Sequence, residues 1–420
     1  MENQRDIALV DCDNFFVSCE RIFRPDLNTR PVVVLSSNDG CVVSRSKEVK
    51  AMGVKMGEPW FKLQKYHSVI TAFSSNFKLY ADISSRVKRL LADFSPIQES
   101  YSIDESFLEL TGFRDVWDRA FTIRHEMLRQ LSIPVCIGIA PTKTLAKLAN
   151  HIAKKHPRSR GVFSWNRLTE RQKQTLLTAI PISEIWGIGK KMGRHLARQQ
   201  ITTAWQLKTA NLDMIRSRYG VILARLVSEL REEPCLDLVE MRPPRQQILS
   251  SRSFGHLVSR LDVLENAVAY HASHVSETLR KEKSLANLIQ VFLQTDRFRD
   301  DLPQHAPQVW QSFPAPTDDT LTITQTAIAG LRDIACPLVA YKKAGVCLHG
   351  LMPATDITPD LFTQRSSPAL TATLDAINQR FGPNTLCVAS NNAQTRLWQP
   401  RKEKISPEYT TRWSDFLICY

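Results

Sequence analysis

Two short stretches decide the fold of this chain, Ile7-Ala8-Leu9-Val10-Asp11 and Tyr101-Ser102-Ile103-Asp104-Glu105. Asp11 ends the first, an apolar run, and Asp104 and Glu105 stand together in the second. Acids at the ends of two apolar segments can converge at one edge of a sheet. Oxygen ligands without His or Cys favour Mg²⁺ or Mn²⁺ over zinc, and a pair of such ions serves in-line phosphoryl transfer. The alternative is that all three are ordinary surface turn acids.

Length and charge set the broad class of the protein. The 420 residues exceed what one core accommodates, which predicts about three or four domains. A formal net charge of +13 favours a polyanionic partner such as DNA, RNA or an anionic membrane. No apolar run approaches the length of a membrane span, and the polar N-terminus lacks a signal-peptide core. Nine scattered cysteines without a Cys-x-x-Cys pair argue against zinc sites and predict a cytoplasmic location.

The apolar pattern predicts strands alternating with helices up to about residue 165. Expected strands cover residues 7–10, 32–35, 107–110 and 135–140, and expected helices cover residues 48–52 and 77–94. A further helix is expected after residue 141, with Thr142 as its N-cap. This alternation predicts an α/β or α+β catalytic domain. Residues 168–232 are expected to be all-helical, and Pro243-Pro244 marks a linker.

The later part of the chain has a different order of elements. Strand, helix, strand, strand, helix and strand are expected at residues 247–253, 261–279, 288–295, 308–313, 322–332 and 344–349. This order predicts a small two-layer domain. The tail after Met352 is rich in Pro, Thr, Asn and Ser, so we expect it to be poorly ordered unless a partner holds it.

A basic helix face is expected beside the acids. Lys143, Lys147 and Lys154 are spaced by four and seven residues, which keeps them on one face at about 3.6 residues per turn. This face could hold a triphosphate or a DNA backbone, although a solvated helix face is the commoner case for lysines. A second basic cluster, formed by Arg45, Lys47 and Lys50, favours the functional interpretation.

A glycine motif precedes another basic segment. Gly187 and Gly189 stand before Lys190, but Gly193 comes one position too late for the dinucleotide-binding pattern and no buried strand precedes the motif. The pattern predicts a helix-hairpin-helix, whose free backbone N–H groups and helix N-terminus attract a DNA phosphate. The alternative is an ordinary glycine helix cap.

Two apolar pairs stand near functional candidates. Phe15 and Phe16 follow the first acid closely, and could either wall the site or pack in the core. Leu361 and Phe362 follow Asp360 in an acidic-apolar peptide, which could anchor in a partner's pocket.

Together these motifs resemble the Y-family, error-prone DNA polymerases, and they are most similar to the UmuC type. The resemblance runs nearly from end to end of the chain. The segments that carry it, besides the second acidic stretch, are Phe23-Arg24-Pro25-Asp26-Leu27, Ser37-Asn38-Asp39-Gly40-Cys41, Gly53-Val54-Lys55-Met56-Gly57, Thr142-Lys143-Thr144-Leu145-Ala146-Lys147-Leu148-Ala149-Asn150, Trp186-Gly187-Ile188-Gly189, Ser251-Arg252-Ser253-Phe254-Gly255 and Ser406-Pro407-Glu408-Tyr409-Thr410-Thr411-Arg412-Trp413.

The resemblance implies an α+β, right-hand polymerase with five parts. These are a palm (residues 1–30 and 78–167), fingers (31–77), a helical thumb with the hairpin (168–240), a βαββαβ little finger (245–352) and a C-terminal tail for clamp or accessory binding (353–420). It also implies that Asp11, Asp104 and Glu105 hold two Mg²⁺ ions, or Mn²⁺, together with the Cys12 carbonyl. Phe16 matches the steric gate, whose ring crowds a ribose 2′-OH and so selects dNTPs.

The resemblance assigns further residues to binding. Lys50 and Lys154 match positions that bind the incoming dNTP, and Lys47 falls where many relatives have a triphosphate-binding Tyr. The residues expected to bind DNA are Lys143, Lys147, Gly187, Gly189, Lys190, Arg252 and Ser253. Asp360, Leu361 and Phe362 resemble a sliding-clamp motif, with Thr358 where the family usually has Gln.

The implied function is template-directed, error-prone DNA synthesis across lesions in the bacterial SOS response. The reaction is two-metal nucleotidyl transfer from a dNTP to a primer 3′-OH. Implied partners are template–primer DNA, a cleaved UmuD-type accessory dimer, the RecA filament and the sliding clamp. Two alternatives are a nucleotidyl cyclase-like two-metal enzyme and a non-catalytic DNA-binding scaffold of the same fold. The hairpin and little finger argue against the first, and the intact set of carboxylates argues against the second.

Overall fold

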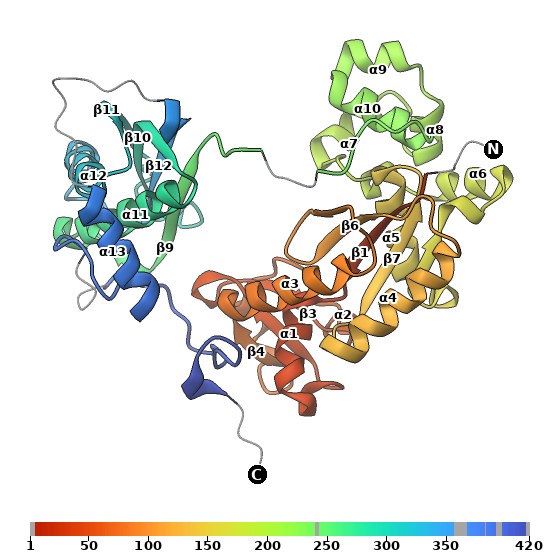
Figure 1. Ribbon diagram of the computed structural model, residues 1–420, viewed down its shortest axis with the longest axis horizontal. Coiled ribbons are helices and arrows are strands. Elements are labelled where there is room, and N and C mark those ends of the chain that lie inside the picture. Colours follow the sequence, from red (N-terminus) through yellow and green to blue (C-terminus); the bar gives the residue numbers. More distant parts are fainter. Residues whose placement is uncertain (1–4, 240–242, 357–367, 383, 392–396, 417–420) are drawn as a thin grey trace. The chain divides into compact units, whose positions relative to one another are not determined.

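The computed structural model describes residues 5–239, 243–356, 368–382, 384–391 and 397–416. Contacts divide the chain into two units (Figure 1). The first unit contains Met1–Leu35, Cys41–Arg242 and Ile405–Tyr420, and the second contains Ser36–Gly40 and Pro243–Lys404. Within the described residues, none of the helices has the length and apolar character needed to cross a membrane.

A five-stranded sheet forms the centre of the first unit, in the strand order β5-β6-β1-β7-β8. Its strands are β1 (Ile7–Cys12), β5 (Gln98–Ser100), β6 (Glu105–Glu109), β7 (Val135–Ala140) and β8 (Val162–Ser164). Because β1 pairs antiparallel with both β6 and β7, Asp11 lies opposite Glu105 on one side and Cys136 on the other. The two acidic stretches are therefore neighbours in one sheet.

Helices cover both faces of this sheet. They are α1 (Phe15–Phe23), α3 (Phe77–Ala92), α4 (Val116–Leu131) and α5 (Lys143–Lys155). On β1, Ala8 and Val10 share a core with α1, α3 and α4, whereas Ile7 and Leu9 share a second core with α5. Successive side chains of a strand point to opposite faces, so Asp11 lies on the α5 face.

The chain segment between β1 and β5 forms a second, three-stranded sheet in the order β3-β2-β4. It consists of β2 (Val32–Leu35), β3 (Val42–Arg45) and β4 (Thr71–Ser74), accompanied by α2 (Lys47–Ala51). Every residue of β2 is buried, which the β-branched sequence predicts. Val32 and Val34 pack into the core of α1 and α3, while Val33 and Leu35 pack into a separate cluster within this small sheet.

Residues after the main sheet are helical, as the sequence predicts. The helices are α6 (Glu170–Ala179), α7 (Lys190–Ala197), α8 (Ala204–Thr209), α9 (Leu212–Tyr219) and α10 (Val221–Leu230). Thr169 and Thr203 begin α6 and α8 with capping boxes, in which a side chain and the backbone satisfy one another at the helix start. Apolar residues of these helices continue the core formed by α5.

The second unit has the predicted order of strand, helix, strand, strand, helix and strand. Its elements are β9 (Ile248–Val258), α11 (Leu261–Lys281), β10 (Ser284–Gln294), β11 (Gln308–Thr317), α12 (Thr320–Ile334) and β12 (Tyr341–Pro353). The strands form an antiparallel sheet in the order β11-β10-β12-β9. Apolar residues of α11 and α12 share one core with this sheet. The α+β fold class predicted from the sequence is thereby confirmed.

The C-terminal residues are more ordered than their composition predicts. Helix α13 covers Pro368–Phe381. Trp398 is 1% exposed in the core of the second unit, where its indole N–H donates to Asn266 over 2.8 Å. Tyr409 is buried in the first unit. The expectation of a poorly ordered tail is wrong for these residues, because a few well-spaced buried side chains anchor a polar sequence.

Candidate active site

The three predicted carboxylates line one cavity of about 430 Å³ in the first unit. Asp11 belongs to the end of β1 and Glu105 to the start of β6, where the register places them opposite each other. Asp104 comes just before β6, and its backbone carbonyl accepts a 2.9 Å hydrogen bond from the Cys12 amide. Antiparallel pairing therefore brings together acids that are far apart in the sequence.

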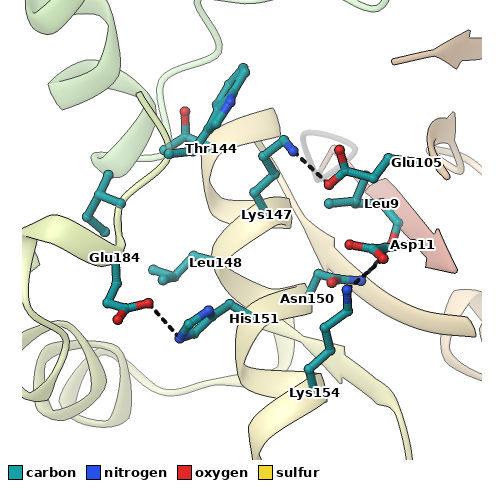
Figure 2. A pocket seen from close by; sticks show the side chains of 12 residues that line it. Leu9, Asp11, Glu105, Thr144, Lys147, Leu148, Asn150, His151, Lys154 and Glu184 are labelled. Atoms are coloured by element: carbon teal, nitrogen blue, oxygen red, sulfur yellow. Dashed lines mark hydrogen bonds and ion pairs between the residues drawn. The ribbon is translucent and has the colours of Figure 1, made fainter. Parts of the chain in front are cut away.

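Two of these carboxylates form ion pairs with lysines of α5. Lys154 Nζ lies 2.6 Å from Asp11 Oδ1, and Lys147 Nζ lies 2.8 Å from Glu105 Oε1 (Figure 2). Both pairs line a second cavity of about 240 Å³. Asp11 faces α5 because of its place in the alternation of β1, and the two lysines lie on one face of that helix. The basic face predicted from spacing therefore meets the acids at these two positions.

Burial and neighbouring charges decide the protonation of this site. Burial raises the pKa of Asp11 to about 6; Lys154 acts against this rise, while Glu105 and Asp104 add to it. Burial works to lower the pKa of Lys154, but Asp11 outweighs it, and the pKa lies above its ordinary value. Clustered carboxylates repel one another and gain from any nearby cation. The site is thus built to hold positive charge.

The ligand chemistry of the cavity suits a divalent metal ion. Three carboxylates and the Cys12 backbone offer oxygen donors, which Mg²⁺ and Mn²⁺ prefer. Across the described part of the chain, no group of three His, Cys, Asp or Glu side chains is gathered closely enough to hold a metal. In this arrangement the ammonium groups of Lys147 and Lys154 neutralise the acids. The types of ligand present therefore suit such an ion, and Lys147 and Lys154 compete with it for the carboxylates.

Ser102 is a site residue that sequence reasoning did not single out. Its hydroxyl donates to Asp104 Oδ1 over 2.6 Å. The Ser102 Oγ also accepts hydrogen bonds from the backbone N–H groups of Asp104 and Glu105, at 3.2 and 3.0 Å. Ser102 thereby fixes the turn that presents both acids. The available signal was a Ser shortly before the acids, since Ser commonly forms such local turns.

The two neighbouring phenylalanines have different environments. Phe15 is 3% exposed and belongs to the core, although part of it reaches the cavity wall. Phe16 lines the same cavity as the acids. Its ring stacks on Tyr80 with centroids 4.6 Å apart at 15°, and Phe77 meets it edge-on at 6.0 Å. Phe16 is therefore held by aromatic contacts from α3 at the edge of the cavity.

Among the second basic cluster, Lys50 and Arg45 line the cavity. Lys50 Nζ donates to Asn14 Oδ1, and burial lowers the pKa of Lys50, with Arg45 acting in the same direction. Lys47 begins α2 and is exposed, outside the residues that line the cavity. Arg45 is a basic residue of the cavity to which the sequence assigned no separate role. The predicted triphosphate contact of Lys47 stays a prediction.

Lys143 lies in a buried ion pair. It is 5% exposed, and its Nζ lies 2.6 Å from Glu99 Oε2 and 3.3 Å from the Asp237 carbonyl. The ammonium group of Lys143 is thus occupied by protein acceptors, and its predicted contact with DNA stays a prediction. Helical spacing places a residue on a face, but it does not reveal which distant segment covers that face.

Lys147 also differs from a free basic side chain. Besides the pair with Glu105, its Nζ lies 4.3 Å from the ring centre of Tyr101 and 5.4 Å from that of Trp186. Trp186 Nε1 donates to the Tyr101 hydroxyl over 3.2 Å. These two rings were part of quoted motifs but had no predicted role. They hold Lys147 toward the acids by cation–π attraction.

The predicted hairpin has the backbone that its glycines suggest. Gly187 has a φ of 85°, which favours glycine, and Gly189 is the N-cap of α7. Gly187, Gly189 and Lys190 are all exposed. A basic helix that starts at an exposed glycine leaves backbone N–H groups available to an anion.

The remaining predicted DNA and clamp residues lie elsewhere. Arg252 is exposed on β9, with its guanidinium carbon 5.6 Å from the ring centre of Tyr270. The Ser253 carbonyl accepts a 3.2 Å hydrogen bond from Asn38 Nδ2, within the second unit. The clamp-binding residues predicted at positions 360, 361 and 362 (Asp360, Leu361 and Phe362) lie outside the described residues.

Models of known families match most of the chain. The model described as the impB/mucB/samB family matches residues 10–151, and the model of that family's C-terminal domain matches residues 245–361. A third model, described as a domain of unknown function, matches residues 368–418.

Similar proteins match the chain over nearly its whole length. UmuC of Salmonella typhimurium strain LT2 is 40% identical over 420 residues, which cover 98% of this chain and 99% of that protein. SamB of Salmonella typhimurium is 39% identical over 417 residues, covering 97% and 98%. A DNA polymerase IV of Dehalococcoides mccartyi strain CBDB1 is 27% identical over 392 residues, covering 90% and 95%.

Solved structures of similar fold include a Y-family DNA polymerase chimera of Dbh and Dpo4. It matches with a TM-score of 0.66 and 21% sequence identity, covering 83% of this chain and 99% of that one. An insertion ternary complex of Dbh DNA polymerase matches with a TM-score of 0.53 at the same identity and coverage. At 21% sequence identity, these two matches show that the chain shares the fold of those structures.

Proposed function

Because the chain belongs to the impB/mucB/samB family and is a UmuC-type, Y-family DNA-directed DNA polymerase, we propose that it performs error-prone synthesis across DNA lesions. In this proposal it transfers a nucleotide from a dNTP to a primer 3′-OH opposite a template. The cellular setting that we propose is the bacterial SOS response.

One observation carries the proposal: Asp11, Asp104 and Glu105 line a cavity together with Lys50 and Lys154. Acids attract the cations that phosphoryl transfer requires, and lysines attract the triphosphate that accompanies them. A cavity of about 430 Å³ with both kinds of charge suits a nucleotide triphosphate.

The metal ions proposed are two Mg²⁺, held by the three carboxylates and the Cys12 carbonyl. When bound, such ions lower the pKa of a primer hydroxyl and neutralise the charge that develops on the phosphates. The chain's own residues bind and orient the reactants. Lys154 breaks its ion pair with Asp11 and then contacts the triphosphate together with Lys50.

Phe16 sets the choice of sugar in this proposal. Its ring lies at the edge of the cavity and is packed against α3. A rigid ring against C2′ of the sugar leaves room for hydrogen but not for a hydroxyl. Packing density inside proteins is high, so the ring has little space into which it could retreat.

The partners proposed follow from charge and from the family. Template–primer DNA would contact exposed backbone and basic groups at Gly187, Gly189 and Lys190, and at Arg252 in the second unit. Lys147 reaches the same DNA only after it leaves Glu105. A cleaved UmuD-type dimer, the RecA filament and the sliding clamp are further proposed partners, with the clamp bound at residues 360–362.

Primer extension with Mg²⁺ and dNTPs tests the proposal. Asp104→Ala and Glu105→Ala are each expected to reduce the extension rate by at least a thousandfold (~4 kcal/mol), because each change removes a ligand of the proposed metal ions. Both variants should still bind template–primer DNA. Asp118→Ala, which removes an exposed acid of α4, is the matched control and should extend primers normally.

The same assay separates the two alternatives. Activity that needs no primer would favour a nucleotidyl cyclase. DNA binding with steep salt dependence but no extension by the unmodified protein would favour a scaffold. Extension at a normal rate by either acidic variant would overturn the assignment of the site.

A further inference from the structure

The segment Ile405 to Tyr409, within the domain of unknown function, is packed into the first unit. Ile405 forms a parallel bridge with Ser74 at the end of β4. Tyr409 is 8% exposed and stacks on Phe23 of α1, with ring centres 4.5 Å apart at 13°. Both ends of this short segment are thus fixed, by contacts with β4 and α1.

Between these ends lies a buried polar contact made by Ser406. Ser406 is 5% exposed, and Asn76 Nδ2 donates to its carbonyl and to its hydroxyl oxygen, each over 3.1 Å. The Ser406 hydroxyl in turn donates to Glu20 Oε1 over 3.0 Å. Asn76 is also the N-cap of α3, where its side-chain oxygen accepts the Leu79 amide. The segment therefore contacts the first turn of α3.

Glu20 connects this contact to the cavity. The Tyr80 hydroxyl donates to the same oxygen, Glu20 Oε1, over 2.6 Å, and both side chains are fully buried. The other oxygen, Oε2, has no hydrogen-bond partner among the described residues. Tyr80 presents its ring to Phe16, stacked at 4.6 Å. A continuous series of contacts thus runs from Ser406 through Glu20 and Tyr80 to the ring at the cavity edge.

We propose that Ser406 is a positioning residue for sugar selection, which fixes Glu20 and Tyr80 and thereby the ring of Phe16. This inference rests on the proposed function, in which Phe16 excludes the ribose 2′-OH. It gives the C-terminal domain a role inside the polymerase itself, as part of the wall that selects the nucleotide.

The physical argument concerns the tolerance of a steric filter. A single oxygen atom distinguishes the two sugars, so a small displacement of the ring admits the wrong one. The ring of Tyr80 stacks on one face of Phe16, and the hydroxyl of Tyr80 is held by the buried carboxyl of Glu20. A buried carboxyl is costly unless its oxygens accept hydrogen bonds. Without the Ser406 hydroxyl, the Tyr80 hydroxyl is the remaining hydrogen-bond donor to the Glu20 carboxyl. The carboxyl can then rotate, and Tyr80 rotates together with it.

Ser406→Ala in the full-length protein tests the inference. The quantity to measure is the ratio of kcat/KM for a dNTP to kcat/KM for the matching rNTP. We expect this ratio to fall about fivefold, with dNTP extension largely retained, since the change is about one buried hydrogen bond. Ser414→Ala, which removes an exposed hydroxyl of the same tail, is the control and should leave the ratio unchanged. A merely structural role would lower both efficiencies together and would not change the ratio.

Two further variants keep the inference open to refutation if Ser406→Ala does not fold. Tyr80→Phe removes the other hydroxyl on Glu20 but keeps the stacked ring, and it should lower the ratio as well. In a Phe16→Ala background, Ser406→Ala should have no additional effect on the ratio, because the filter is already gone. An additional effect there, or an unchanged ratio in folded Ser406→Ala or Tyr80→Phe, overturns the inference.

The outcomes also separate this inference from the proposed function. If the unmodified protein does not extend primers, or if Phe16→Ala does not admit ribonucleotides, the proposed function or its filter fails, and this inference fails with it. If both hold and the single variants keep the normal ratio, only the role of Ser406 fails.

Discussion

Replacing Lys143 by methionine should destabilise the first unit rather than weaken DNA binding. Lys143 and Glu99 have side chains that are 6% and 10% exposed, and Glu99 also accepts the Val239 amide over 2.9 Å. Breaking a buried pair leaves an uncompensated charge, at a cost of about 3–5 kcal/mol. At about 2–4 °C per kcal/mol for a unit of this size, Tm should fall by roughly 6–20 °C.

Thermal unfolding followed by circular dichroism measures this loss. The matched control is Lys190→Met, which removes the same charge from an exposed position. It should leave Tm within about 1 °C. It should also make the slope of the logarithm of the DNA affinity against the logarithm of the salt concentration shallower by about 1, the equivalent of one released counterion. The double variant Lys143→Met with Glu99→Gln should recover much of the stability, because no unpaired charge remains. A Lys143→Met protein with normal Tm and a reduced salt slope would refute the reasoning and restore Lys143 to the DNA-binding set.

Three other changes have defined outcomes. Phe16→Ala should raise ribonucleotide incorporation in primer extension by at least tenfold, and unchanged incorporation would show that Phe16 is not the filter. Gly138→Ala should destabilise the first unit by about 3 kcal/mol or more in denaturant titration, because its Cβ would overlap the α5 backbone at Asn150. A free energy of unfolding within about 0.5 kcal/mol of that of the unmodified protein would contradict this. Burial raises the pKa of Glu20 from 4.5 to about 7, so the folded state binds the extra proton. The free energy of unfolding should therefore fall by at most about 3 kcal/mol as pH rises from 4.5 through 7. Glu20→Gln should remove this pH dependence, and the same pH dependence in both proteins would disprove the prediction.

Local features of the fold could be predicted well from the sequence. Strand β7 lies where the apolar run at residues 135–140 predicts it, and Thr142 caps α5 by accepting the Leu145 amide. Such features depend on neighbours within a few residues, whose patterns repeat in many proteins. The meeting of Asp11 with Glu105 was also predictable, since acids at strand ends gather at sheet edges.

Contacts between distant segments could not be predicted in the same way. Lys143 looked like part of a basic face, but residues near Asp237, after α10, enclose it. Ser406 lies in a segment whose composition resembles disordered chain, yet it forms a buried contact with Glu20. Composition averages over many residues, whereas one or two well-placed side chains decide whether a segment docks.

The docking of residues 405–409 beside α1 and α3 has a consequence for the timing of biosynthesis. Glu20, Asn76 and Tyr80 leave the ribosome early, and Ser406 is translated only after everything that it touches. At about 5–20 residues per second, this interval lasts on the order of tens of seconds. During that time a nascent chain already carries every acid of the candidate metal site, but it lacks the hydroxyl that completes the Glu20 contact. If Ser406 has the proposed role, nucleotide selection would therefore mature only after the acids of the site have been synthesised.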